Sequence, residues 1–295
     1  MNQTRQLLLI VNPSAGGGRA GDALPDVQEA LRRHGLEHRV ETTRDLDHAR
    51  ELARAAAQSA ETAVAFGGDG LVGAVAGALK YTEATLGVLP GGRGNDFARV
   101  LGIPLEPVAA CQVLATGVVR ALDLGQAGAG TFVGIASCGF DSDANRIANQ
   151  ARVVRGNLVY TYAAIRALLS WKPARFELTL DGDVKHVVTG YSVGAANNKA
   201  YGGGMYAAPG AELDDGLLDI ITLGEMSKRR FLFSFLPKVF KGGHIEEPEV
   251  TVHRSAQVEI SADRPFTVYA DGDPIAELPV TVTALPGAVS VLVPR

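Results

Sequence analysis

The sequence predicts an α/β domain with a largely parallel sheet, followed by a mostly antiparallel β-sandwich domain. Up to about residue 124, aliphatic runs alternate with stripes of apolar residues at helical spacing. Beyond that point, short strand-like runs follow one another between turn signals such as 181–183 and 271–273. We therefore expect a first domain at 1–124 and a second at 125–287. Whether 288–295 returns to the first domain is left open.

Strands of the first domain are expected where aliphatic residues run together. The run 7–11 has no polar interruption, as is typical of a strand buried on both faces. The predicted strands are 7–11, 39–43, 63–66 and 86–89, and helices are expected at 24–31, at 46–56 and from about 71 to 79. Three glycine-rich loops fall at the carboxyl ends of these strands, where ligands bind in such sheets.

The second domain is predicted from short strand-like runs and two helical interruptions. The predicted strands are 131–136, 176–180, 187–194, 217–223, 257–260, 266–270 and 280–284, with a last run at 289–293. Helical stretches are expected near 145–169 and 227–240. This pattern favours a sandwich of antiparallel sheets.

Composition excludes several classes of protein. The 46% hydrophobic content is too high for a disordered chain, and a net charge of -4 argues against a general nucleic-acid binder. The two cysteines, Cys111 and Cys138, fit neither a zinc nor a disulfide pattern. No run approaches the roughly 18 apolar residues of a spanning helix, and the run 7–11 is too short for a signal peptide. We expect a cytoplasmic protein whose membrane contact is peripheral, at the inner surface.

The first glycine-rich loop, 12–18, lies between a strand and a helix. Glycine lets the backbone approach a phosphate, and the following helix N-terminus attracts anions. Asn12 and Ser14 can hydrogen-bond a nucleotide, and Gly16 belongs to the glycine run. A steric need for glycine in a strand-to-helix turn explains the loop equally well. The spacing matches neither a Walker A loop nor a Rossmann fingerprint.

The second and third loops add charged groups to glycine turns. Gly67, Gly68, Asp69 and Gly70 form a tight turn that exposes one carboxylate, as phosphoryl transfer requires near metal and phosphates. An ordinary Asp-Gly turn is the alternative. The third loop, 89–99, places Arg93 among glycines, which suits phosphate, and leads into a helix capped by Asn95 or Asp96. A well-capped helix start is its alternative explanation.

In this order and spacing, the three loops resemble the diacylglycerol kinase catalytic domain superfamily. This superfamily holds bacterial lipid kinase-like enzymes, is related to sphingosine and ceramide kinases, and is more distantly similar to NAD kinases. The resemblance continues at 101–104, 203–211, 215–219, 241–244 and 271–273, and so covers nearly the whole chain. It implies a nucleotide-binding domain followed by a β-sandwich, an active site in the cleft between them, ATP as co-substrate and Mg²⁺ as cofactor.

The resemblance also implies roles for single residues. ATP would meet Asn12, Ser14, Gly16, Thr43, Gly67, Gly68, Gly70, Gly92, Arg93 and Asn95. The catalytic acids would be Asp69, Asp96, Asp271 and Asp273, the last two supplying the general base. Asp215 and the carbonyl region of Leu217 would hold a structural magnesium ion. The chain departs from the family at Leu71, Gly73 and Ala74, where Thr and an Asn-Glu pair are usual, and at Asp273, where Glu is usual.

The activity expected from the resemblance is transfer of the γ-phosphate of ATP to the primary hydroxyl of a lipid alcohol, with diacylglycerol as first choice. The motifs lie mainly in the ATP half, so a kinase for a sphingoid base, ceramide or another lipid alcohol is the alternative. A nucleotide-binding regulatory protein without turnover is a second alternative, which the four retained acids oppose. The expected partners are the lipid and the membrane surface, without nucleic acid; a homodimer is left open.

One stretch, 227–241, carries a separate membrane signal. Phe231, Phe235 and Val239 form one row at helical spacing, and cations lie near both ends of the stretch. A basic amphipathic helix of this kind can lie on anionic lipid. A helix that faces the core with a solvated basic end is the alternative that we favour. Pro237 speaks against a regular helix here.

Overall fold

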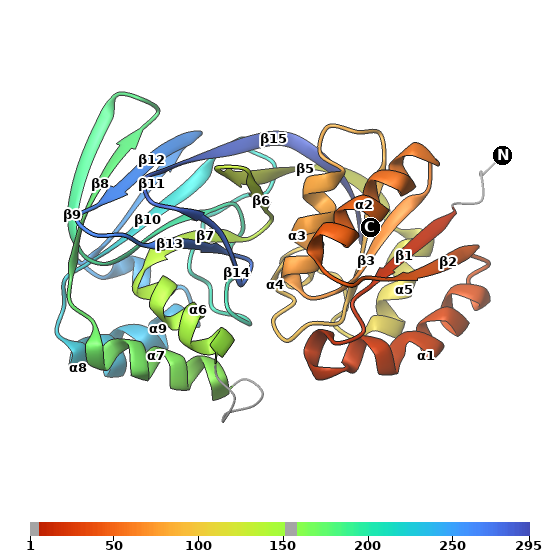
Figure 1. Cartoon of the computed structure of the whole chain (residues 1–295), viewed down its shortest axis with the longest axis horizontal. Helices are drawn as coiled ribbons and strands as arrows, with labels where there is room; N and C mark the ends of the chain where they lie inside the picture. Colours follow the sequence, from red (N-terminus) through yellow and green to blue (C-terminus); the bar gives the residue numbers. More distant parts are fainter. Residues whose placement is uncertain (1–5, 151–157) are drawn as a thin grey trace. The chain divides into compact units, whose positions relative to one another are not determined.

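The computed structural model describes residues 6–150 and 158–295 (Figure 1). The chain divides into two compact units: unit 1 contains Met1–Leu124 and Pro286–Arg295, and unit 2 contains Gly125–Leu285. Within the described residues, no helix is long and apolar enough to cross a bilayer.

Unit 1 is a parallel sheet with helices on both faces. Its strand order is β15-β4-β3-β1-β2, and every neighbouring pair is parallel. The helices α2 and α3 pack together on one face, and α1 and α5 pack together on the other (Figure 1). The strands are β1 (Leu7–Val11), β2 (His38–Thr42), β3 (Thr62–Gly67), β4 (Thr85–Pro90) and the end of β15 (Val280–Val293). The helices are α1 (Arg19–Arg33), α2 (Leu46–Gln58), α3 (Asp69–Ala78), α4 (Asp96–Val100) and α5 (Pro107–Thr116).

The central strands of unit 1 are buried on both faces, as their aliphatic composition predicts. All residues of β1 and β3 are buried. Because β1, β3 and β4 are parallel neighbours, their carboxyl ends meet at one edge of the sheet. Each of these ends is followed by a glycine-rich loop. The prediction missed α5 and the start of β5 (Val118–Ala127).

Unit 2 is built from antiparallel strands that form a sandwich-like arrangement. Its main strand order is β14-β13-β7-β9-β8-β12-β15, and β10 pairs with β9 and β11. The strands are β6 (Gly130–Phe132), β7 (Ile135–Gly139), β8 (Ala174–Leu180), β9 (Val184–Ala196), β10 (Leu218–Gly224), β11 (Val250–Ser255), β12 (Gln257–Ala262), β13 (Thr267–Ala270) and β14 (Asp273–Glu277). The predicted fold class, an α/β domain followed by a β-sandwich domain, is confirmed.

The strand β9 changes partners part-way along its length. Residues before Gly190 pair with β8, and residues after it pair with β7 and β10. A side chain at Gly190 would lie against the carbonyl oxygen of Leu223, so glycine is required where the strand crosses between layers.

An aromatic cluster fills the core of unit 2 beneath its helices. Phe140 packs edge-on against Trp171, Tyr191 and Phe231, and Trp171 stacks on Tyr191. The helices over this core are α6 (Phe140–Gln150), α7 (Leu158–Ser170), α8 (Lys228–Arg230) and α9 (Leu236–Val239). Trp171, which is 3% exposed, is therefore central to the core.

Three sequence predictions in unit 2 need correction. The predicted strand 131–136 is two strands, β6 and β7, since the main-chain N–H groups of Val133 and Gly134 bond a distant carboxylate instead of a neighbouring strand. The predicted helix near 145–169 is two helices, and its middle, 151–157, lies outside the described residues. The runs 280–284 and 289–293 are one strand, β15.

The stretch 227–241 is helical but irregular, as Pro237 predicts. Between α8 and α9 lies one π-helical turn, η2 (Phe231–Phe235), in which Leu236 donates to the carbonyl of Phe231. Pro237 has no N–H to offer the preceding turn, so the wider turn occurs directly before it. Phe231, Phe235 and Val239 face the core, which confirms the core-facing alternative for that row.

Candidate functional site

The three glycine-rich loops of unit 1 touch one another at the carboxyl edge of the sheet. Gly91 donates its N–H to the carbonyl of Gly67 at 2.8 Å. A side chain at Gly16 would lie against the Gly91 carbonyl oxygen, and one at Gly92 would lie against the backbone of Gly68. The glycines are therefore needed for the close approach of three backbones, and this approach gathers main-chain N–H groups at one place.

The first loop is held in shape by its own polar side chains. The Oδ1 atom of Asn12 accepts hydrogen bonds from the N–H of Ser14 at 3.2 Å and from its hydroxyl at 2.8 Å. Gly16 has φ +64°, a left-handed conformation that favours glycine. Thr43 directly follows β2 and donates its N–H to Val11 at 2.8 Å, which places it at the same edge.

Asp69 links the second loop to the third. Its carboxylate oxygens accept the N–H groups of Asp96 at 3.2 Å and of Phe97 at 3.1 Å, so it caps the start of α4 from another helix. Burial raises the pKa of Asp69, the Asp96 carboxylate raises it further, and the N–H donors oppose both effects. Asp69 nevertheless keeps part of its surface accessible.

The predicted cap of α4 is corrected by this geometry. Asn95 precedes the helix in a left-handed conformation, with φ 53°, and its side chain does not cap it. Instead the Asn95 amide accepts the N–H of Gly92 at 2.8 Å and donates to the Gly92 carbonyl at 3.1 Å. Asn95 thus closes the third loop, and Asp69 supplies the cap.

Cations surround these loops, and sequence reasoning found only one of them. Arg93 is exposed and forms no ion pair among the described residues. Arg19, in the first turn of α1, donates to the Gly92 carbonyl at 3.5 Å. Arg99 lies 3.7 Å from the buried carboxylate of Asp96. Arg19 directly follows the glycines of the first loop, and Arg99 ends the third loop. This closeness to the glycines in sequence is the signal that could have identified both.

In unit 2, the carboxylate of Asp271 accepts hydrogen bonds from the main chain between β6 and β7. Its two carboxylate oxygens accept the N–H groups of Val133 and Gly134, both at 2.9 Å. Asp271 itself sits in the turn after β13 with φ 53°, and Asp273 begins β14. The predicted acid pair therefore lies in one tight turn, with one member anchored by main-chain donors.

The predicted magnesium site at Asp215 and Leu217 does not fit the residues present. One carboxylate oxygen of Asp215 accepts the N–H of Leu217 at 2.9 Å, and the other pairs with Arg254. Arg254 also lies 3.3 Å from Asp219. A guanidinium thus already supplies the positive charge between these two acids.

An acid that sequence reasoning missed lies at the start of α6. Burial raises the pKa of Asp141 to about 6, against hydrogen bonds from Ser192 and Ser137 that favour the charged form. The side chain is half-buried. Asn145, one turn later, donates to the hydroxyl of Tyr201 at 2.8 Å.

The likeness to known proteins decides the family. Residues 6–127 match the diacylglycerol kinase catalytic domain, and residues 134–293 match the YegS C-terminal NAD kinase beta sandwich-like domain. A curated diacylglycerol kinase of Mycobacterium tuberculosis is 35% identical over 97% of this chain and 94% of its own length. The chain belongs to the diacylglycerol kinase family. It is a lipid kinase by family, and the predicted recognition and enzyme class are confirmed.

Other members and structures agree with this placement. A protein of Pseudomonas fluorescens named "Probable lipid kinase YegS-like" is 32% identical over 99% of this chain and 96% of its own length. A diacylglycerol kinase structure from Bacillus anthracis has a TM-score of 0.76 at 21% identity, covering 99% of this chain and 98% of that one. The structure of an NAD kinase of Archaeoglobus fulgidus in complex with ATP has a TM-score of 0.51 at 15% identity, covering 98% of this chain and 93% of that one. The two structures show that this lipid kinase shares their fold.

Proposed function

We propose that this lipid kinase transfers the γ-phosphate of ATP to the primary hydroxyl of diacylglycerol, giving phosphatidic acid. The observation that carries the proposal is the meeting of three glycine loops around Asp69, which gathers N–H groups and cations suited to phosphates. The printed name of the Mycobacterium relative supports diacylglycerol as the acceptor.

ATP is proposed to lie with its phosphates on these loops. The N–H groups of Gly16 and Gly68 would face phosphate oxygens, and Arg19 and Arg93 would balance their charge. Ser14 and Thr43 would contact the nucleotide at the same edge.

Magnesium fits the acids of this region better than it fits Asp215. Asp69 and Asp96 are close enough for each charge to disfavour the other, and a divalent cation would relieve that repulsion. Within 6–150 and 158–295, no three acids, histidines or cysteines could hold a metal together. Mg²⁺ commonly binds through one or two carboxylates plus substrate phosphates, so it would arrive with ATP and stabilise the charge of the transferring group.

The acid pair of unit 2 is proposed to accept the proton of the lipid hydroxyl. The hydroxyl oxygen bonds to the γ-phosphorus, the bond from that phosphorus to the ADP oxygen breaks, and the proton passes to a carboxylate. Both oxygens of Asp271 already accept main-chain hydrogen bonds. We therefore assign the base to Asp273 and the positioning of its turn to Asp271.

The alternatives concern the acceptor and turnover itself. A sphingoid base, ceramide or another lipid alcohol would use the same phosphate loops. A nucleotide-binding regulatory protein without turnover would keep the loops but would not need Asp273. Because the acceptor is a membrane lipid, we propose peripheral action at the cytoplasmic face; a homodimer stays a prediction.

The test is phosphate transfer from γ-labelled ATP with magnesium. Separate detergent micelles present diacylglycerol, sphingosine, ceramide or no lipid, and a further reaction contains NAD. We expect labelled phosphatidic acid only with diacylglycerol. Label on another lipid reassigns the acceptor, and ATP binding without any labelled product supports the regulatory alternative.

A further inference from the structure

Two neighbouring helical segments of unit 2 expose large apolar side chains. On α7, Ile165 and Leu169 are one turn apart on the outer face, and Leu169 is 70% exposed. On the segment 228–241, Phe233 is 77% exposed and Phe240 is 53% exposed. Leu and Phe of this size are normally buried, so their exposure on adjacent segments indicates a surface that another body covers.

The two segments meet and face away from one core. The Nζ atom of Lys228, at the start of α8, donates to the Leu169 carbonyl at the end of α7 at 2.8 Å. Ala167 and Leu168 of α7 and Phe231 and Phe235 of η2 are all buried in the same cluster. Because both segments bury their inner sides in that cluster, their exposed rows lie on the outside of unit 2.

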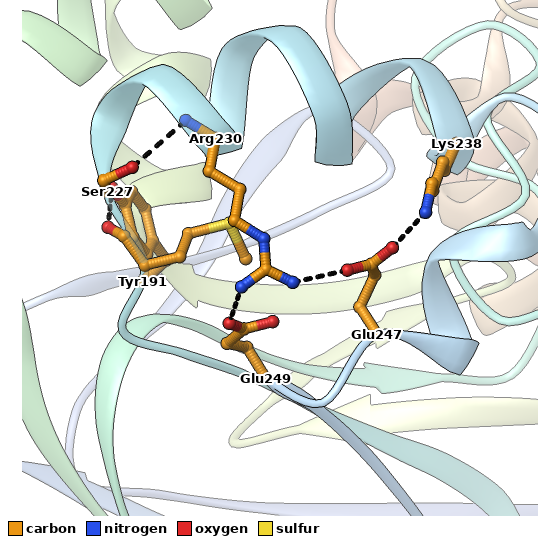
Figure 2. A network of polar contacts seen from close by, with 7 residues as sticks. Tyr191, Ser227, Arg230, Lys238, Glu247 and Glu249 are labelled. Atoms are coloured by element: carbon orange, nitrogen blue, oxygen red, sulfur yellow. Dashed lines mark hydrogen bonds and ion pairs between the residues drawn. The ribbon is translucent and has the colours of Figure 1, made fainter.

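The two stretches that carry these apolar residues contain several cations and no acid. The stretches 162–172 and 227–241 contain no Asp or Glu, in a chain whose net charge is -4. Two of their cations are neutralised, since Arg230 pairs with Glu247 and Glu249, and Lys238 pairs with Glu247 (Figure 2). Five exposed cations of these stretches form no ion pair with the described residues: Arg166, Lys172, Lys228, Arg229 and Lys241.

We propose that Ile165, Leu169, Phe233 and Phe240, with Arg166, Lys172, Lys228 and Arg229, form a docking surface for an anionic lipid bilayer. Apolar side chains would enter the boundary between headgroups and acyl chains, while the cations meet anionic headgroups. The charge complementarity is the argument for lipid over a protein partner. The inference rests on the proposed function, because a kinase for a membrane lipid must reach its acceptor there.

The ion-pair network of Figure 2 holds the segment 228–241 in place, so that its exposed side chains stay on the outer side. Arg230 and Lys238 fasten the segment to Glu247 and Glu249 next to β11, so the segment is held from the inner side. Phe233 lies in the π-helical turn η2 between Arg230 and Lys238, and this turn contains one more residue than an α-helical turn. Arg230 is thus a scaffold residue, and Arg229 is the cation that meets lipid.

The test measures binding to vesicles without ATP. The full chain is cosedimented with vesicles of phosphatidylcholine alone or with about 30% phosphatidylglycerol. We expect binding only to the anionic vesicles. The double variant Leu169→Ser, Phe233→Ser should lower the partition coefficient about tenfold or more. Lys228→Glu, Arg229→Glu should lower it similarly, with an effect that shrinks in about 0.5 M NaCl.

A matched control lies on β9, where Val187 is 58% exposed and Lys185 is exposed. Val187→Ser, Lys185→Glu should bind vesicles as the wild type does. All substituted side chains are exposed, so thermal midpoints should stay unchanged and confirm folding. Equal losses in the control, wild-type binding by the surface variants, or no anionic preference would overturn the proposal.

Two further measurements separate the proposals. Phosphate transfer to diacylglycerol in detergent micelles should be unchanged in the surface variants. Vesicle binding without transfer to any lipid would leave the docking surface in place and reject the kinase proposal. A dimer that forms without lipid, and that the Leu169→Ser, Phe233→Ser variant loses, would assign the surface to a second copy of the chain instead.

Discussion

The carboxylate of Asp69, at the start of α3, accepts the main-chain N–H of Phe97 at 3.1 Å and so caps a different helix, α4. One acid thereby ties the second glycine loop to the third. The same acid is expected to face magnesium and phosphate. A substitution of Asp69 should therefore affect both the stability of the fold and turnover.

Asp69→Asn is expected to lower kcat at least about 10²-fold, because it removes negative charge beside the transferring group. The free energy of unfolding should fall by about 1 kcal/mol, because the amide NH₂ group replaces one of the two oxygens that accept main-chain hydrogen bonds. Loss of the repulsion from the Asp96 carboxylate offsets part of this cost. Kinetics and urea unfolding measure both effects. Asp47→Asn, in the exposed first turn of α2, is the control and should change neither. Full activity in Asp69→Asn would contradict its placement in the site.

Gly16→Ala is expected to weaken ATP binding about tenfold or more, because its methyl group would push Gly91 and the third loop away. Gly35→Ala is the matched control. Gly35 has φ +69°, close to the +64° of Gly16, yet open space surrounds it. Both variants should lose about 1 kcal/mol of stability from the strained backbone. Isothermal titration with ATP should show a loss of affinity only for Gly16→Ala; equal affinities would argue against convergence of the loops on the nucleotide.

Asp271→Asn and Asp273→Asn should differ in their effect on stability. Both should lower turnover, while ATP binding persists. Asp271→Asn should also cost about 1–3 kcal/mol, because an amide cannot accept from both Val133 and Gly134. Turnover assays and urea unfolding of the pair test the assignment of the base. If both variants kept near-normal turnover, the base would lie elsewhere.

Asp141→Asn is expected to stabilise the protein at neutral pH. The folded chain holds the Asp141 proton up to about pH 6, whereas an ordinary Asp loses it near 3.8. The folded state therefore binds more protons in that window, and ionisation makes stability fall as pH rises through it. With allowance for partial exposure, the variant should gain about 1 kcal/mol at about pH 7.5 and little at about pH 4. Urea unfolding at both pH values measures this, and an equal change at the two would contradict the assignment.

The sequence alone was enough for the fold class, the family and the glycine loops. Parallel strands buried on both faces leave an aliphatic signature in each strand, and loops that bring backbones together need glycine at each position. Both signals are local, and so is the acid pair in the turn at 271–273. The roles of the single residues at these loops stay predictions.

Only the tertiary structure decided which groups the polar side chains meet. Asp271 bonds Gly134 across 137 positions, and Asp69 caps a helix 28 positions away. The pairing of Asp215 with Arg254, and the exposure of Leu169 beside Lys228, also depend on segments far apart in the chain. A hydrogen bond or ion pair depends on the final distance between two groups, and local periodicity carries no information about that distance.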